Sequence, residues 1–253
     1  MAKTTFTDID AEPVTSNEEA PKTETTALAP TQSTAVAAQD DSFFSNEGFE
    51  GFADKKALEI PRIILVHAVG DLSANFEPGS VVLNGEKKLV LPLEIIPLRV
   101  SNFIREHIPY NDESRKDDIP KTWKTPEEAR KDGFVFFWEK DREDKSTPVC
   151  ENAANIDLLM KGYPEIADLC PVNIGDDFFM PVRMSVKGKQ HKLVYNKLYT
   201  QASFNKGAPP CAFRWTLSTK RLKEGSNWVW RMHIDLKGRN TPEQIEQYRS
   251  ILG

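Results

Sequence analysis

Two runs of alternating side chains near the C-terminal end constrain the fold more than any other feature of the sequence. Apolar Phe213, Trp215 and Leu217 alternate with polar residues, and a second alternation follows over 228–236. The segment 223–227, which contains glycine, serine and asparagine, joins the two runs. A period of two places successive side chains on opposite faces of a sheet. This region therefore predicts an antiparallel strand pair with one apolar face, and it places the tryptophans of the second run in the core.

Further strands are predicted upstream, beginning near residue 60. Residues 62–67, 134–138 and 179–184 are apolar runs of strand length. Residues 81–83 and 89–91 flank Asn84-Gly85, a pair that suits the positive φ angles of a tight hairpin turn. The middle and end of the chain are therefore expected to be β-rich.

Helices are predicted to be few and short. Thr125-Pro126-Glu127-Glu128 and Thr241-Pro242-Glu243-Gln244 both combine an N-cap, a first-turn proline and a capping-box residue. A third helix is possible over 152–162, and the charged stretch 105–124 is expected to be a long surface loop. The expected architecture is mainly β, a barrel or sandwich of about seven strands in one domain over 59–253.

Residues 1–58 have the composition of a disordered arm. They are poor in large aliphatic residues and rich in Thr, Ala, Pro, Glu and Ser. Such a stretch buries too little apolar surface to offset the roughly 1–2 kcal/mol per residue lost when a backbone is ordered.

An acidic, aromatic island lies within this arm. Its composition is typical of short linear motifs that dock into a basic, apolar-floored pocket of a partner protein. An almost equally good interpretation is that the island attaches the arm to its own domain. The candidate partner-binding residues are Asp40, Asp41, Phe43, Phe44, Phe49 and Phe52.

The charge is separated along the chain. Residues 1–58 carry a net charge of −7 and residues 59–182 a net charge of −8, whereas residues 183–231 contain 11 basic side chains and one acid, Glu224. Such separation indicates a surface whose electrostatics serve a partner of opposite sign. The net charge of −5 for the whole chain conceals it.

The basic segment 183–231 is the candidate nucleic-acid interface. Cations track phosphates, and aromatic faces stack on unpaired bases. Residues 187–192 resemble a hairpin tip with projecting cations, and Tyr195, Tyr199 and Phe204 are the favoured stacking residues. The alternative is an ordinary solvated face of a sheet. The predicted binding residues are Arg183, Lys187, Lys189, Lys192, Tyr195, Lys197, Tyr199, Phe204, Lys206, Arg214, Lys220, Arg221 and Arg231.

Motifs of catalysis and cofactor binding are missing from the sequence. It contains no phosphate-binding glycine loop, no dinucleotide fingerprint and no nucleophile elbow. Cys150, Cys170 and Cys211 are widely spaced, which fits reduced, packed thiols better than a zinc site or disulfides. The sequence therefore predicts a binding protein with no catalytic residues, cofactor or metal. A hydrolase site assembled from distant acids and histidines is the least favoured alternative.

Neither a membrane span nor a signal peptide is expected. No apolar run approaches the roughly 18–20 residues that a spanning helix needs. The N-terminus lacks the basic start and apolar stretch of a secretory signal. A cytoplasmic protein is expected.

Several segments are similar in layout to phage single-stranded-DNA-binding proteins of replication modules. These are 61–67, 76–79, 192–195 and 228–230, and the resemblance covers most of 60–236. It implies an OB-like barrel, sequence-tolerant coating of single strands, and cooperation with polymerase, helicase or recombinase partners. The chain departs from this class at one point, because its acidic aromatic island is N-terminal and its C-terminus is not acidic.

The leading expectation is single-stranded DNA binding by residues 183–231 in phage DNA replication or recombination. The arm would compete with DNA for the basic groove and present its phenylalanines to partner proteins. The alternative is a phage structural or assembly protein that docks acidic protein partners through its basic face.

Overall fold

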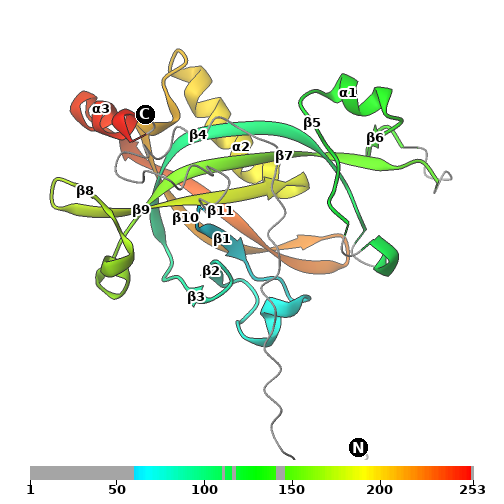
Figure 1. The fold of residues 1–253 in the computed structure, drawn as a ribbon, viewed down its shortest axis with the longest axis horizontal. Coiled ribbons are helices and arrows are strands. Elements are labelled where there is room, and N and C mark those ends of the chain that lie inside the picture. The colour runs from blue at the N-terminus through cyan, green and yellow to red at the C-terminus, as the bar shows by residue number, and fades with distance from the viewer. Residues whose placement is uncertain (1–59, 110–111, 116–117, 141–145, 252–253) are drawn as a thin grey trace, which may run out of the picture. The chain divides into compact units, whose positions relative to one another are not determined.

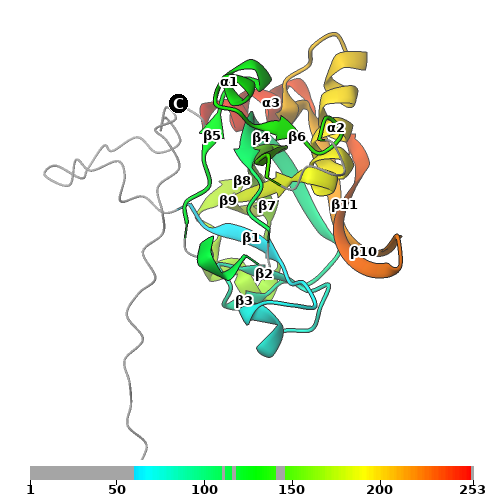
Figure 2. The same ribbon diagram turned by 90° about the vertical axis from the view of Figure 1, so that its right-hand side faces the viewer.

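The computed structural model describes residues 60–109, 112–115, 118–140 and 146–251. The predicted disordered arm and its aromatic island lie outside the described residues. The described part of the chain is mainly β, and its long strands bend so that the sheet curls strongly into a half-barrel (Figures 1 and 2).

Eleven strands of the described residues form one sheet, in the order β11-β10-β4-β7-β9-β1-β2-β3, with β5, β6 and β8 added to β4, β7 and β9. This exceeds the seven strands expected, because five of the eleven are only two or three residues long. The strands are β1 Arg62–Leu65, β2 Val81–Leu83, β3 Lys87–Lys88, β4 Leu93–Glu106, β5 Thr122–Trp123, β6 Val135–Phe136, β7 Val149–Lys161, β8 Val172–Ile174, β9 Asp177–Lys187, β10 Phe213–Glu224 and β11 Asn227–Arg239.

The helices lie at the two ends and on one face of the sheet. Among the described residues, three are α-helices and the others are short 3₁₀ helices. They are α1 Pro126–Lys131, α2 Gly188–Phe204 and α3 Pro242–Ser250, with 3₁₀ turns η2 Asp71–Ala74, η3 Glu113–Arg115, η4 Pro164–Leu169 and η5 Pro210–Ala212.

The main core fills the inner face of the curled sheet. In β7, Ile156, Leu158 and Met160 point to this face, and Val194 and Leu198 of α2 pack into the same cluster. A smaller core on the other face lies under α3, and a third joins α1 to the far ends of β4 and β7. One face of helix α2 therefore packs against this core.

The predicted hairpin of 213–236 is confirmed. Strands β10 and β11 pair antiparallel along their whole length, with Leu217 opposite Ile234. The hairpin of 81–91 is confirmed at its turn, where Asn84 and Gly85 have φ angles of 51° and 79°. Its first strand is β2, as predicted, but the prediction of the second strand at 89–91 is wrong, because β3 is Lys87–Lys88.

Both capped helices are confirmed. Thr125 accepts a hydrogen bond from the Glu128 amide at the start of α1, and Thr241 and Gln244 form a reciprocal capping box at the start of α3. The possible helix over 152–162 is wrong, because these residues form β7. Both faces of β7 are buried, so the strand shows no polar alternation.

The hairpin tip expected at 187–192 is also wrong, because this segment ends β9 and begins α2. The chain turns at Gly188, whose φ angle of +53° suits glycine. A Cβ atom at this position would lie 2.6 Å from a carboxylate oxygen of Glu151. The buried residues Gln190, Val194 and Leu198 then recur every fourth position, which places them on one helix face.

Helix α2 covers the edge strand of the sheet. The Gln190 side-chain amide donates to the Met232 carbonyl at 2.7 Å and accepts from the Met232 amide at 2.9 Å. Lys197 donates to the Ile234 carbonyl at 2.7 Å. These bonds satisfy backbone groups of β11 that an open edge would expose. The half-barrel is thus closed along β11 by a helix.

The segments from 60 to 251 that the structure describes contain no helix with the length and apolar character of a membrane span.

Candidate nucleic-acid interface

Three aromatic rings lie in a row along α2. His191, Tyr195 and Tyr199 are four residues apart, a spacing that places side chains above one another on a helix. The rings of His191 and Tyr195 are stacked with centroids 4.4 Å apart, and those of Tyr195 and Tyr199 are 6.0 Å apart at 14°. We call these three residues the ring ladder.

The buried end of the ring ladder is fixed by β4. Nε2 of His191 lies 2.8 Å from the side-chain oxygen of Asn102. Burial, followed by the charge of Lys192, lowers the pKa of His191 below its ordinary value. A neutral imidazole therefore stacks on Tyr195 at neutral pH, and the ladder starts from a rigid base.

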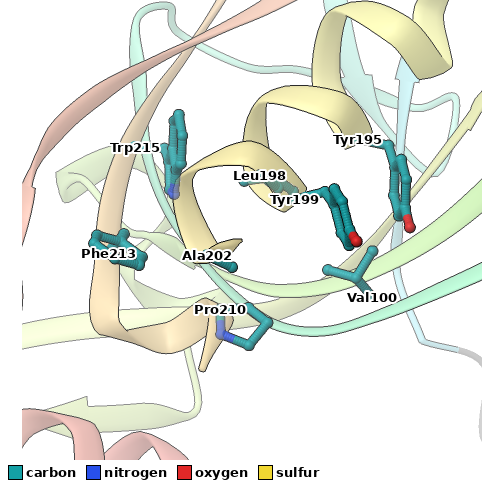
Figure 3. A pocket seen from close by; sticks show the side chains of 8 residues that line it. All are labelled: Val100, Tyr195, Leu198, Tyr199, Ala202, Pro210, Phe213 and Trp215. Atoms are coloured by element: carbon teal, nitrogen blue, oxygen red, sulfur yellow. The ribbon is translucent and has the colours of Figure 1, made fainter. Parts of the chain in front are cut away.

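The other end of the ladder opens to solvent beside a small pocket (Figure 3). Tyr199 is 62% exposed, and its ring forms one wall. The pocket has a volume of about 150 Å³ and lies between α2, β4, η5 and β10. It is lined by Val100, Tyr195, Leu198, Tyr199, Ala202, Pro210, Phe213 and Trp215.

One cation of the same helix and one just beyond its end have no carboxylate partner among the described residues. Lys192 is exposed near its start, and Lys206 is exposed just beyond its end. Phe204, in the last turn, is 82% exposed. The structure thus places these residues and the two tyrosines on one helix and the turn that follows, along with the paired Lys189 and Lys197. We call Lys192, Tyr195, Tyr199, Phe204 and Lys206 the α2 surface.

Most other predicted cations contact carboxylates of the chain itself. Seven have a carboxylate oxygen within 4.0 Å, supplied by four acids from elsewhere in the fold and by Glu224 of the segment itself. The pairs are Arg183–Asp157, Lys187–Glu151, Lys189–Glu224, Lys197–Asp235, Arg214–Glu94, Lys220–Asp235 and Arg231–Glu224.

These pairs differ in strength. Arg183 donates at 2.6 Å to Asp157, which is buried on the outer face of the sheet and also binds Arg99. Arg183 is therefore a structural cation. Lys187 and Lys220 lie 3.8 and 3.9 Å from their carboxylates, and both side chains are about half exposed. Exposed pairs of this kind contribute at most about 1 kcal/mol, so a phosphate can replace the carboxylate.

Glu224 is the centre of a cluster of charged side chains at the surface. It accepts hydrogen bonds from Lys189 at 2.8 Å and from two nitrogens of Arg231 at 3.0 Å. These partners, Arg231 first, lower the pKa of Glu224 to about 2. The cluster ties the start of α2 to the tip of the β10–β11 hairpin.

A second exposed aromatic group lies at that hairpin tip, and sequence reasoning missed it. Trp228 is 56% exposed, whereas the alternation placed it in the core. The guanidinium of Arg221 lies 5.6 Å from its ring centroid. Strand β4 pairs only with Trp215–Leu217 of β10. The alternation of side chains continues beyond this point, toward the hairpin tip, where β4 no longer lies beside the strand pair. Proximity to the basic turn is the signal that distinguishes Trp228 from the core residues of the same run.

The histidines, cysteines and acids do not gather into a metal site within the described residues. No group of three or more such side chains there has the arrangement to hold an ion. Cys150, Cys170 and Cys211 are free and buried, as the sequence indicated, and burial raises the pKa of each thiol. They act as packing residues.

Comparisons of the chain with protein-family models, with curated proteins and with solved structures found no match.

Proposed function

We propose that the chain binds single-stranded DNA through the α2 surface. The observation that supports this best is the ring ladder, which leads from a rigid, buried histidine to the exposed ring of Tyr199 beside an open apolar pocket. Lys192 and Lys206 provide positive charge near the two ends of the helix.

Stacking favours single strands over duplexes. A base stacked on an aromatic side chain contributes roughly 1–3 kcal/mol, and only an unpaired base has a face free for it. Every base has such a face, so the binding is tolerant of sequence. Tyr199 and Phe204 are the exposed stacking residues of the α2 surface.

The hairpin tip extends this interface. Arg221 and Trp228 form a cation–aromatic pair there, and the nearby Lys220 and Lys223 are exposed. The Glu224 cluster connects the tip to α2. A strand that passes from α2 to the tip would meet cations and rings along its path, which suits phosphate tracking with base stacking.

The class of the fold and the role of the arm belong to the same proposal. We infer that the half-barrel is an OB-like module of phage DNA replication or recombination, and that the arm, through residues 40–52, recruits replication or recombination proteins. The mainly β fold and the curled sheet support it (Figure 2).

Fluorescence anisotropy of a labelled, unstructured ~30-nucleotide DNA, beside its duplex, tests the proposal. We expect tighter binding to the single strand, weakening steeply between low and moderate salt as counterions are released. Tyr199→Ala should weaken binding about tenfold, the loss of one stacked base. Trp138→Ala is the matched control, because Trp138 is equally exposed (64%) but lies outside α2.

Absence of binding at low salt would exclude single-stranded DNA binding. The alternative would then be a structural or assembly protein with protein partners. Phe137 and Trp138 favour that alternative, because both are exposed apolar residues outside the basic segment. Large stable oligomers without nucleic acid, measured by light scattering, would support it.

A further inference from the structure

The pocket beside Tyr199 has the size of one six-membered ring. A cavity of about 150 Å³ in a protein core is known to hold benzene, and the volume here is about 150 Å³. The walls are aromatic or aliphatic, as in most sites for planar ligands. Figure 3 shows Tyr195 and Tyr199 side by side at one wall and Phe213 and Trp215 at the other.

One buried polar atom in the residues that line the pocket has no partner in the described part of the chain. The indole Nε1 of Trp215 has no hydrogen-bond partner among the described residues, and the side chain is 4% exposed. In Figure 3 this nitrogen lies at the end of the indole nearer to Ala202 and Phe213. Buried indole N–H groups usually have an acceptor. Trp215 lines the pocket, so an acceptor on a ring that enters the pocket is the nearest candidate partner for Nε1.

The ring ladder sets the orientation of a planar ring that enters the pocket. The planes of Tyr195 and Tyr199 are within 14° of each other. A planar ring that enters beside Tyr199 extends the stack by one member, with its edge directed toward β10. An occupant therefore needs a flat six-membered ring with an acceptor oxygen on its edge.

We infer that the pocket binds one unpaired pyrimidine base of the DNA strand. The base stacks on Tyr199, and a carbonyl oxygen accepts a hydrogen bond from Nε1 of Trp215. Thymine carries such oxygens, whereas adenine has ring nitrogens and an amino group instead and is wider. This inference rests on the proposed function and adds to it a preferred base and a defined position for that base.

Ala202→Leu is the variant that tests the pocket. Ala202 lines the pocket, and a leucine there fills the space without changing any charge. Ser203→Leu is the matched control, because it adds an apolar side chain to the next, exposed position of the same helix. Binding of oligo(dT), of oligo(dA) and of an abasic strand with the same phosphates is measured for both variants and for the wild type.

We expect Ala202→Leu to weaken oligo(dT) binding about tenfold relative to Ser203→Leu, and to leave binding of the abasic strand unchanged. The wild type should bind oligo(dT) more tightly than oligo(dA). An independent readout needs no pocket variant. In ¹⁵N-labelled wild type, oligo(dT) should shift the indole N–H signal of Trp215, identified among five tryptophans by its loss in Trp215→Phe.

Two results would overturn the inference, and they are distinguishable. If oligo(dT) binds, but both leucine variants bind it equally and the Trp215 signal does not move, the pocket is not a base site and single-stranded DNA binding stands. If the wild type binds no strand even at low salt, the proposed function fails and the base site fails with it.

Discussion

Glu224 shows how one residue can organise a charged surface. It is the one acid in the basic segment, and it binds Lys189 and Arg231 from two different elements. Sequence reasoning found the excess of cations, but it could not show that most of them are paired, because the acids that pair with Arg183 and Arg214 lie far away in the sequence. The candidate nucleic-acid interface is therefore smaller than the sequence predicted, and consists of the α2 surface and the hairpin tip.

Glu224→Gln should lower the free energy of unfolding at pH 7 by about 1–2 kcal/mol, since bonds to a charged group contribute about 1.5–3 kcal/mol and partial exposure weakens them. The pKa of Glu224 is depressed from about 4.5 to about 2 in the folded protein. Its stabilisation is therefore complete above about pH 4.5 and is lost as the pH falls toward 2.

Urea titrations of wild type and Glu224→Gln at pH 7 and pH 3 measure this. The difference between the two proteins should shrink by more than half at pH 3. Glu246→Gln removes an exposed i,i+3 partner of Arg249 and is the control, with little effect at either pH. An equal difference at both pH values would contradict the assigned pKa.

At the scale of elements, α2 replaces a strand at the sheet edge. The side-chain amide of Gln190 copies the donor and acceptor of a backbone peptide and bonds both groups of Met232. Such a device is invisible in the sequence, where Gln190 is one polar residue within a basic run. Only the contact with Met232 shows that Gln190 covers the sheet edge.

Gln190→Ala should destabilise the protein by about 1–3 kcal/mol, because it leaves the buried backbone groups of Met232 without partners. Gln201→Ala, on the same helix and with no side-chain bond among those described, should have little effect. Urea unfolding followed by circular dichroism measures both, with an unchanged dependence on urea concentration. Equal stability of the two variants would show that the β11 edge is not held by Gln190.

The elements that the sequence predicted are those with local signals. Alternation marked β10 and β11, the Asn84-Gly85 pair marked a turn, and proline-threonine caps marked α1 and α3. Helix α2 and strand β7 were missed for opposite reasons. Gly188 and several aromatic residues hid the four-residue period of α2, and β7 is buried on both faces.

At the scale of the whole molecule, charge is divided between sequence regions. Residues 1–58 carry a net charge of −7 and lie outside the described structure, and residues 183–231 carry +10. The folded part alone balances much of the positive charge through ion pairs. We propose that the acidic arm competes with DNA for the cations that remain.

Deletion of residues 1–58 should tighten single-stranded DNA binding on the order of tenfold at low ionic strength, with the gain fading at moderate salt as screening increases. Anisotropy titrations of both proteins at two salt concentrations measure the effect. A full-length variant with the arm's Asp and Glu changed to amides should reproduce it. Unchanged affinity in both variants would remove the competition and leave the binding proposal intact.

The two faces of α2 have different tolerance to sequence change. Gln190, Val194 and Leu198 close the sheet, whereas Lys192 and Tyr199 face outward on the same turns. Outward substitutions leave the closure of the barrel untouched. Substitutions on this one helix face can therefore change the ligand that a relative of this chain binds, while the half-barrel stays the same.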